Sequence, residues 1–298
     1  MPPSYRETGR FGSQKATPPP SNENNYFFRT KSLQQQEHDA LSALFGREYT
    51  IPPPPRELFT TMDAMKKKET KGRPCFIPQP QLIQDSGFPG WTPQFGDWFW
   101  SAMNGGKISK DSITTPGCWT IFDATPKTQT VSIAEPRNNW WGGDNSDYYS
   151  SYSSAPKTVT YPDDHFVGNL LSHLRSTKEI SLPHDTDKEI TQIPENSRLG
   201  LSRAVIKKIV LPTLASLLYL PLGVQVKLPN PVESSFFNAR QQNQDGGNVG
   251  EWLDGNYAHN GLYQGLFEEP DHSISTYPTS TLNPRLGFRF MITFPSAR

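Results

Sequence analysis

The last third of the chain constrains the fold more than any other part, because three structured segments frame a polar interval. Residues 228–233 (Leu-Pro-Asn-Pro-Val-Glu) open it, residues 247–252 (Gly-Asn-Val-Gly-Glu-Trp) follow, and residues 286–290 (Leu-Gly-Phe-Arg-Phe) close it. Residues 253–285 have almost no hydrophobic period and are rich in Asn, Tyr, His, Ser and Thr. High polarity without periodicity is typical of a loop. The pattern predicts a rigid scaffold that presents a loop surface.

The composition limits the size and the partners of the protein. With 298 residues the chain allows one or two domains, at about 150 residues each. Its 29 basic and 29 acidic residues give a net charge of zero. Because phosphate binding needs an excess of Lys and Arg on one face, we expect no nucleic-acid partner. The hydrophobic fraction of 34% and the 29 prolines indicate that part of the chain is extended.

Targeting signals are not apparent. The N-terminus has no apolar stretch like that of a secretory signal. The longest apolar run, residues 209–224, is interrupted by Pro212 and Pro221 and is shorter than the roughly 20 residues that span a bilayer. We therefore expect a soluble protein without membrane insertion, cytoplasmic or associated with a virion or particle. Cys75 and Cys118 predict two reduced, buried thiols rather than a disulfide framework.

Residues 1–73 are expected to form an extended, Pro-rich arm with a helical lead-in. The composition of residues 1–30 favours an extended or disordered tail. The alternative is an arm that docks on a neighbouring subunit through residues 26–28 (Tyr-Phe-Phe). Ser32 is a candidate cap for a first helix that Gly46 ends.

A second helix is expected over residues 56–71. Its lysines, at 66–68 and 71, are most simply a solvated face.

The globular body is expected over residues 74–298, with its core strongest at 200–298. Residues 98–100 (Trp-Phe-Trp) carry aromatic mass that predicts packing. Residues 118–123 predict a buried strand, and residues 128–133 are a candidate pairing partner for it.

Two further helices are predicted in this body. Asp163 or Asp164 begins the first, because an apolar stripe follows at helical spacing. Ser202 caps the second, a core helix from Arg203 to about Leu220 that is interrupted at Pro212.

A Gly/Ser/Tyr-rich segment at residues 138–152 is a secondary binding-loop candidate. Such composition supplies rigid aromatic contacts and adaptable hydrogen bonds. The alternative is a plain surface insertion whose tryptophans fold back on the body. The candidate contact residues are Trp140, Trp141, Tyr148 and Tyr149.

No sequence motif indicates catalysis. The chain has no nucleophile elbow, no Gly-rich phosphate loop and no His-Glu-x-x-His. His184 with Asp185 and Asp187 has the donor atoms of a cation site, but a polar turn is the simpler interpretation because no second ligand cluster accompanies it. We expect no enzyme, no cofactor and no metal site.

Three segments of the last third resemble a known family. Leu228-Pro229, Glu233 and Ala239-Arg240 are similar to the Leu-Pro-Thr-Glu-Ala-Glu-Trp-Glu-Tyr-Ala-Ala-Arg helix of the formylglycine-generating enzyme (sulfatase-modifying factor) family, with the Arg displaced by one residue. Residues 248–252 resemble its Gly-Asn-Val-x-Glu-Trp, and residues 287–289 its terminal Gly-Phe-Arg strand. The three follow in the family's order.

This resemblance implies a fold and excludes the family's reaction. It implies an α+β, C-type-lectin-like domain with a helix, a small set of twisted strands and long irregular loops. The oxidase members bind copper through a cysteine pair in this third, whereas no Cys follows Cys118 here. The chain is therefore not expected to be a catalytic member.

The closest resemblance is to the variable proteins of diversity-generating retroelements, which use this fold for display. Residues 118–124 and 193–198 also resemble their region upstream of the lectin-like domain. In those proteins the interval between the Glu-Trp strand and the Gly-Phe-Arg strand forms the variable ligand-binding face. The usual Gly-Gly-Ser turn after the Trp strand is missing here, which leaves the register of the interval open. The resemblance points to these ligand-binding candidates: Asn256, Tyr257, His259, Asn260, Tyr263, Ser273, Ser275 and Tyr277.

We therefore expect a non-catalytic recognition protein that binds a protein or surface ligand through this interval. The alternative is a structural subunit of a particle or surface assembly. In that case the N-terminal arm and the loop that carries Trp140 and Trp141 make the subunit contacts, including self-association through the arm.

Overall fold

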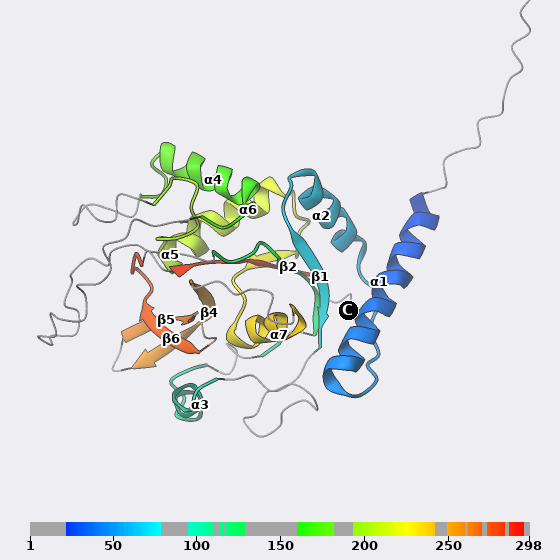
Figure 1. The fold of residues 1–298 in the computed structure, drawn as a ribbon, viewed down its shortest axis with the longest axis horizontal. Helices are drawn as coiled ribbons and strands as arrows, with labels where there is room; N and C mark the ends of the chain where they lie inside the picture. Colours follow the sequence, from blue (N-terminus) through cyan, green and yellow to red (C-terminus); the bar gives the residue numbers. More distant parts are fainter. Residues whose placement is uncertain are drawn as a thin grey trace, which may run out of the picture.

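The computed structural model describes residues 22–78, 95–109, 114–115, 117–128, 160–181, 193–241, 249–259, 262–269, 273–283 and 286–294. These residues build a mixed structure of helices and two four-stranded sheets, which confirms the α+β class (Figure 1). The helical segments are α1 (Asn22–Phe45), α2 (Arg56–Lys67), α3 (Asp97–Asn104), α4 (His165–Ser176), α5 (Arg203–Val205), the π-helical η4 (Ile206–Val210), α6 (Leu211–Leu217) and α7 (Pro231–Gln241).

The first sheet is antiparallel, with the strand order β1-β2-β8-β3. The second has the order β6-β5-β4-β7, and within it β4 and β7 run parallel. The strands are β1 (Gly72–Ile77), β2 (Cys118–Asp123), β3 (Gln225–Lys227), β4 (Gly250–His259), β5 (Leu262–Glu268), β6 (Ile274–Pro278), β7 (Leu286–Gly287) and β8 (Met291–Phe294).

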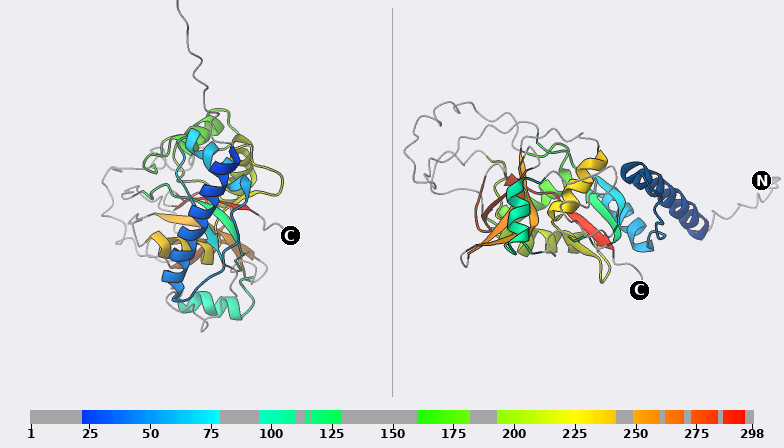
Figure 2. Two further views of the ribbon diagram at one scale, coloured as in Figure 1. Left: turned by 90° about the vertical axis from the view of Figure 1, so that its right-hand side faces the viewer. Right: turned by 90° about the horizontal axis from the view of Figure 1, so that it is seen from below.

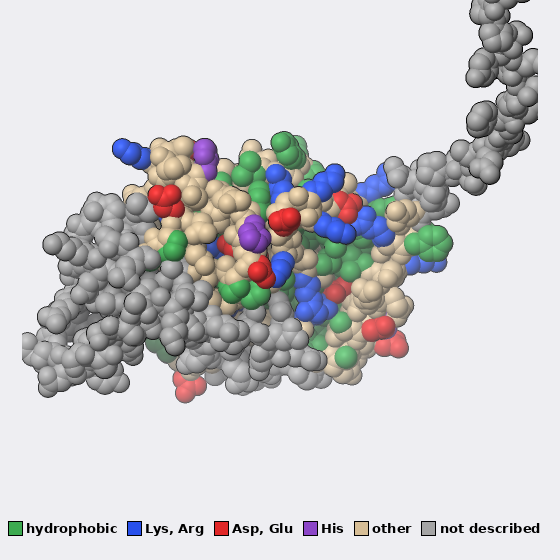
Figure 3. Space-filling view, turned by 45° about the horizontal axis from the view of Figure 1, so that its top comes forward, with side chains coloured by type: hydrophobic (Ala, Val, Ile, Leu, Met, Phe, Trp, Pro, Cys, Tyr) green, Lys and Arg blue, Asp and Glu red, His purple; other side chains and the backbone are tan. Residues whose placement is uncertain are grey.

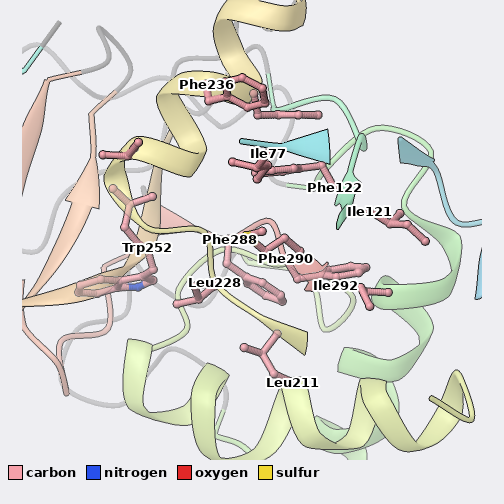
Figure 4. Close-up of a cluster of buried hydrophobic side chains, with 14 of the residues drawn as sticks. Ile77, Ile121, Phe122, Leu211, Leu228, Phe236, Trp252, Phe288, Phe290 and Ile292 are labelled. Carbon is pink, nitrogen blue, oxygen red and sulfur yellow. The ribbon is translucent and has the colours of Figure 1, made fainter. Parts of the chain in front are cut away.

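Helices cover both faces of the first sheet. α7 lies on one side, whereas α4 and α6 lie on the other (Figure 1). In Figure 4, Phe236 of α7 and Leu211 of α6 lie on opposite sides of Phe290 and Ile292. Every residue of β2 is buried, as expected for a strand that is covered from two sides.

The predicted buried strand at residues 118–123 is confirmed, but its predicted partner is wrong. β2 pairs with β1 along its whole length and with β8 from Trp119 to Phe122. Both of its edges are occupied, so no edge remains for residues 128–133. Of these, residues 129–133 lie outside the described part of the chain.

The helical lead-in packs into the same core as the body. Leu41, Phe45 and Leu58 are fully buried in the main hydrophobic cluster, which extends to Phe294. α1 lies along one side of the molecule beside β1 and α2 (Figures 1 and 2). The sequence division at residue 73 therefore marks no break in the core.

Most predicted helix ends are confirmed, with two exceptions. Gly46 follows α1 with φ 65°, a conformation that glycine adopts without steric cost. However, α1 begins at Asn22 rather than after Ser32, so residues 22–30 are helical and not extended. α2 ends at Lys67, before the predicted residue 71. Residues 1–21 lie outside the described part.

The predicted core helix is one continuous helical segment, from α5 through η4 to α6. Ser202 caps it as predicted, since its hydroxyl accepts from the Val205 N–H at 3.3 Å. The helix widens rather than breaks near Pro212: a π turn covers the preceding residues, and the Leu211 N–H donates to the Ile206 carbonyl. Proline supplies no N–H, and a π turn of this kind is a common irregularity within helices.

The polar interval at residues 253–285 contains strands, which corrects the loop prediction. β4, β5 and β6 form an antiparallel set through it. Ala258 pairs with Tyr263 and His259 with Leu262, and residues 260–261 lie outside the described part of the chain.

Candidate functional site

Two of the sequence motifs meet at a buried ion pair. β4 and β7 pair in parallel, with Glu251 opposite Gly287. Arg289, two residues further on, donates from Nε to Oε2 of Glu251 at 2.9 Å, and both side chains are buried. Tyr161 donates its hydroxyl to Oε1 at 2.9 Å, and the Lys127 ammonium lies 3.6 Å from Oε2. The Glu-Trp and Gly-Phe-Arg segments thus form one fixed frame.

The protonation states within this frame are well defined. Burial opposes ionisation of Glu251, but the charges of Arg289 and Lys127 outweigh it and hold the pKa of this carboxyl below its usual value. Burial, together with the charge of Glu251, raises the pKa of Tyr161 well above its usual value. Near neutral pH, Tyr161 is therefore a hydrogen-bond donor to an ionised carboxylate.

A second buried carboxylate ties the sheet to α7. Glu268 lies opposite Glu251 and accepts from the Ser234 hydroxyl at 2.5 Å and the Asn238 amide at 2.7 Å. α7 begins with reciprocal hydrogen bonds: the Glu233 N–H donates to Asn230 Oδ1 at 2.9 Å, and the Asn230 N–H donates to Glu233 Oε2 at 2.8 Å. This capping box fixes the start of the helix that covers the sheet.

Trp252 anchors the other face of β4. It is completely buried, and its indole N–H donates to the Leu201 carbonyl at 2.9 Å. Its ring meets Phe267 edge-on, with centroids 6.0 Å apart. A buried indole with its N–H satisfied packs like a core residue, so this end of β4 is rigid.

A third cluster joins the two upstream segments of the resemblance. The buried Arg198 pairs with Asp123 at the end of β2, and its Nε donates to Asp164 Oδ2 at 2.6 Å. Its guanidinium lies 5.0 Å from the Tyr161 ring centroid. Burial disfavours the charge, but the two aspartates outweigh it and raise the pKa of Arg198. Residues 118–124 and 193–198 are therefore in direct contact.

Beyond Trp252, β4 contains a bulge that Arg203 holds. Trp252 pairs with Phe267 and Asn256 with Gly265, so β4 carries extra residues between these two pairs. Arg203 donates from Nε to the Leu253 carbonyl at 2.7 Å and from Nη1 to Asn256 Oδ1 at 2.8 Å. These bonds tie the irregular part of β4 to the start of α5.

The predicted ligand-binding residues divide between the two faces of this sheet. Asn256, Gly265 and Tyr277 lie in register and share one face. A Cβ on Gly265 would lie 2.7 Å from Arg203 Cδ, so α5 covers this face. Tyr277 stacks on Phe267 at 5.0 Å, packed against the core.

Tyr257 points to the opposite face, because neighbouring residues of a strand alternate. It lies against Trp98 of α3, with centroids 5.3 Å apart. Trp98 is 41% exposed, whereas Phe99 and Trp100 of the same helix are buried. The prediction that all three aromatics pack is therefore wrong for Trp98. Helical spacing could have shown that one of the three points outward, but not which.

Two uncharged polar side chains lie on the same face as Tyr257. Gln264 pairs with Tyr257, and Thr276 lies on the same face of β6. The Thr276 hydroxyl donates to the Gln264 carbonyl oxygen at 2.7 Å. We refer to Trp98, Tyr257, Gln264 and Thr276, of which the last three are partly exposed, as the aromatic row. It offers ring surface, an amide and a hydroxyl for contact.

The remaining candidates take part in the sheet backbone or lie outside the described residues. Ser275 pairs with Phe267, and the Ser273 carbonyl accepts from the Glu269 N–H at 2.8 Å. The backbones of His259 and Tyr263 pair with Leu262 and Ala258. Outside the described residues lie Asn260, Trp140, Trp141, Tyr148, Tyr149 and the segment with His184, Asp185 and Asp187.

The two cysteines are free and buried, which confirms that prediction. Burial raises the pKa of the Cys75 thiol to about 12 and that of Cys118 to about 11, so neither is a thiolate near neutral pH. Within the described ranges, no group of three or more His, Cys, Asp or Glu side chains is placed to hold a metal ion. On the face shown in Figure 3, basic and acidic side chains are interspersed.

No family model, curated protein or solved structure matches this chain. None of the described helices is long and apolar enough to cross a membrane. The fold and the site define an α+β protein in which buried charge clusters hold a sheet that carries the partly exposed aromatic row.

Proposed function

We propose that the protein is a non-catalytic recognition protein that binds a protein or surface ligand through the aromatic row. The observation that carries this proposal is the half-exposed Trp98 in contact with Tyr257. Large aromatic side chains with one open face are enriched among residues that dominate binding energy. Tyr and Trp also lose little rotamer freedom on binding, because each has only two χ angles.

The surroundings of the row support this role. The inner end of β4 is held by Glu251, Arg289 and Trp252, whereas its outer end carries Tyr257. A strand that is fixed at one end can carry different side chains at the other without loss of the core. The resemblance to the variable proteins of diversity-generating retroelements, and to the C-type-lectin-like fold, points to the same kind of display.

The test is capture on arrays of immobilised surface proteins and glycans. The wild-type chain is compared with Trp98→Ser and Tyr257→Ser, and with Tyr219→Ser as a matched exposed-aromatic control in the turn after α6. We expect array signals that both row variants lose and the control keeps. Signals shared equally by all four proteins would show that the row is not the contact surface.

Self-association through α1 is a second candidate, because two adjacent aromatics near its start are exposed. Phe27 is 53% and Phe28 is 70% exposed, whereas Tyr26 is held by its hydroxyl bond to the Pro54 carbonyl at 3.1 Å. Sedimentation velocity over a range of concentrations tests it. A structural subunit would associate, and Phe27→Ser with Phe28→Ser would return it to a monomer; a monomeric wild type contradicts this candidate.

A further inference from the structure

Strand β6 forms an outer edge of the second sheet. Among the described strands, β5 is the only one that pairs with it. The Glu269 N–H donates to the Ser273 carbonyl at 2.8 Å, which continues the antiparallel register of the two strands. Because opposite residues in such a pair alternate between hydrogen-bonded and non-hydrogen-bonded positions, Ile274 and Thr276 occupy non-hydrogen-bonded positions. Their backbone N–H and C=O groups therefore point away from β5.

The other sheet edges in the described part of the chain are protected. In β1, the Phe76 N–H donates to the Glu37 carboxylate at 2.9 Å. β3 has three residues and ends in Lys227, and β7 has two residues. The outer part of β4 forms a bridge with the segment before it, in which Ile108 pairs with Tyr257. Short strands, charged side chains and covering segments are means by which proteins protect sheet edges.

β6 is longer than β3 and β7, and it carries no charged residue. Its sequence, Ile-Ser-Thr-Tyr-Pro, contains β-branched and aromatic residues that favour strands. The proline stands last, at 278, where it removes a donor only from the end of the edge. Residues 275–278 are partly exposed. An uncharged edge with outward N–H and C=O groups is a template for another strand.

We propose that β6 binds an extended peptide segment of a partner protein as an added strand. The backbone of this segment pairs with Ile274 and Thr276, in the manner of peptides that add to an exposed sheet edge. Alternate side chains of the segment lie next to Thr276, at the roughly 5 Å that separates cross-strand neighbours, and the rest of the partner covers the aromatic row. The proposal rests on the proposed function, since it takes the ligand of the row to be a protein.

A peptide backbone fits this edge better than a glycan does. Ile274 and Thr276 are two residues apart in a strand, so their outward donors and acceptors repeat at about 7 Å. An extended peptide presents its own N–H and C=O groups with the same repeat. The hydroxyl groups of a glycan do not follow it, so a glycan would leave part of the edge unpaired.

Peptide selection on the full wild-type chain, from a phage-displayed library of random linear peptides, tests the proposal. Amide hydrogen exchange is then measured with and without a selected peptide. At roughly ten times the Kd, exchange at Ile274 and Thr276 should slow by about tenfold. Exchange at Ser275 should change little, because its N–H already faces β5. Copies of the peptide that are N-methylated at the amides facing β6 keep their side chains and should lose binding.

Two variants at one position separate the backbone from the side chain. Thr276→Pro removes the outward N–H and leaves the bonds to β5 in place. Thr276→Val is its matched control, because both variants lack the hydroxyl and only valine keeps the N–H. Thr276→Pro should bind the selected peptide about tenfold more weakly than Thr276→Val does. Thermal melts of both variants verify the fold, and the N-methylated peptides test the same contact on the wild type.

Three results would overturn the added strand: no peptide is selected, the N-methylated copies bind like the parent, or the two Thr276 variants bind alike. Trp98→Ser reports on the proposed function separately, because it alters the row and leaves the edge intact. Binding lost on Trp98→Ser but kept on Thr276→Pro would retain the row and overturn the added strand. The opposite result would support the added strand and count against the row. Self-association of the wild type in sedimentation velocity, abolished by Thr276→Pro, would assign the edge to a second copy and overturn the proposal.

Discussion

Arg289 and Glu251 form a buried ion pair at 2.9 Å that joins the end of the chain to the first strand of the polar interval. Removing one partner of such a pair leaves a buried charge uncompensated. Arg289→Met should therefore lower the free energy of unfolding by about 3–5 kcal/mol, measured by urea denaturation. The double variant Glu251→Gln with Arg289→Met should recover part of this loss. Equal losses in both would show that packing, not charge, dominates.

Tyr161 should make stability depend on alkaline pH. Its folded-state pKa is raised by burial and by Glu251, so the stability it contributes is fully present below the unfolded pKa of about 10. This contribution is lost as pH rises above that value, because only the unfolded state ionises there. Tyr161→Phe should be less stable near neutral pH but decline less steeply between about pH 9 and 11. Parallel curves for the two proteins would contradict this assignment.

Arg203 should stabilise the bulge of β4 more than it stabilises the hydrophobic core. Its guanidinium bonds to the Leu253 carbonyl and to Asn256. Arg203→Ala should raise amide hydrogen exchange in the outer half of β4, while exchange in β2 stays slow. We expect a loss of unfolding free energy of about 1.5–3 kcal/mol. Uniformly faster exchange in both strands would indicate a global effect instead.

The two tyrosines of the polar interval should behave differently, since they lie on opposite faces. Tyr277→Ser removes a ring stacked on Phe267 and should lower the melting temperature with little effect on ligand capture. Tyr257→Ser removes a half-covered ring beside Trp98 and should reduce capture with a smaller loss of stability. Thermal melts and array binding of the same preparations measure both. The reverse pattern would place the contact surface on the face of the sheet that α5 covers.

Local signals predicted several elements well. Ser202 caps the start of the core helix through its hydroxyl, and Gly46 adopts the left-handed conformation that ends α1. The apolar residues 118–123 form the predicted strand because they are covered on both faces. These features depend on neighbours in sequence or on burial alone.

Features that depend on distant contacts were not predictable. The strands of residues 253–285 show no simple alternation, because a bulge interrupts β4 and because Gly265, against which Arg203 lies, replaces an apolar side chain in β5. α1 has a weak apolar stripe, and its start is held by Arg29, which pairs with Asp63 of α2 at 3.0 Å. The exposure of Trp98 was not predictable either, because Trp98 belongs to the same aromatic run as the buried Phe99 and Trp100.

Glu37 attaches α1 to the edge strand of the first sheet. Its carboxylate accepts from the Phe76 N–H at 2.9 Å and from Arg240 Nη2 of α7 at 2.8 Å, so α1 occupies part of the outer edge of β1. An uncovered strand edge is a template for pairing with another chain. A chain shortened to begin at residue 74 would lose this cover and expose β1 to edge-to-edge aggregation. We therefore expect the N-terminal helix to prevent the first sheet of one molecule from pairing with that of another.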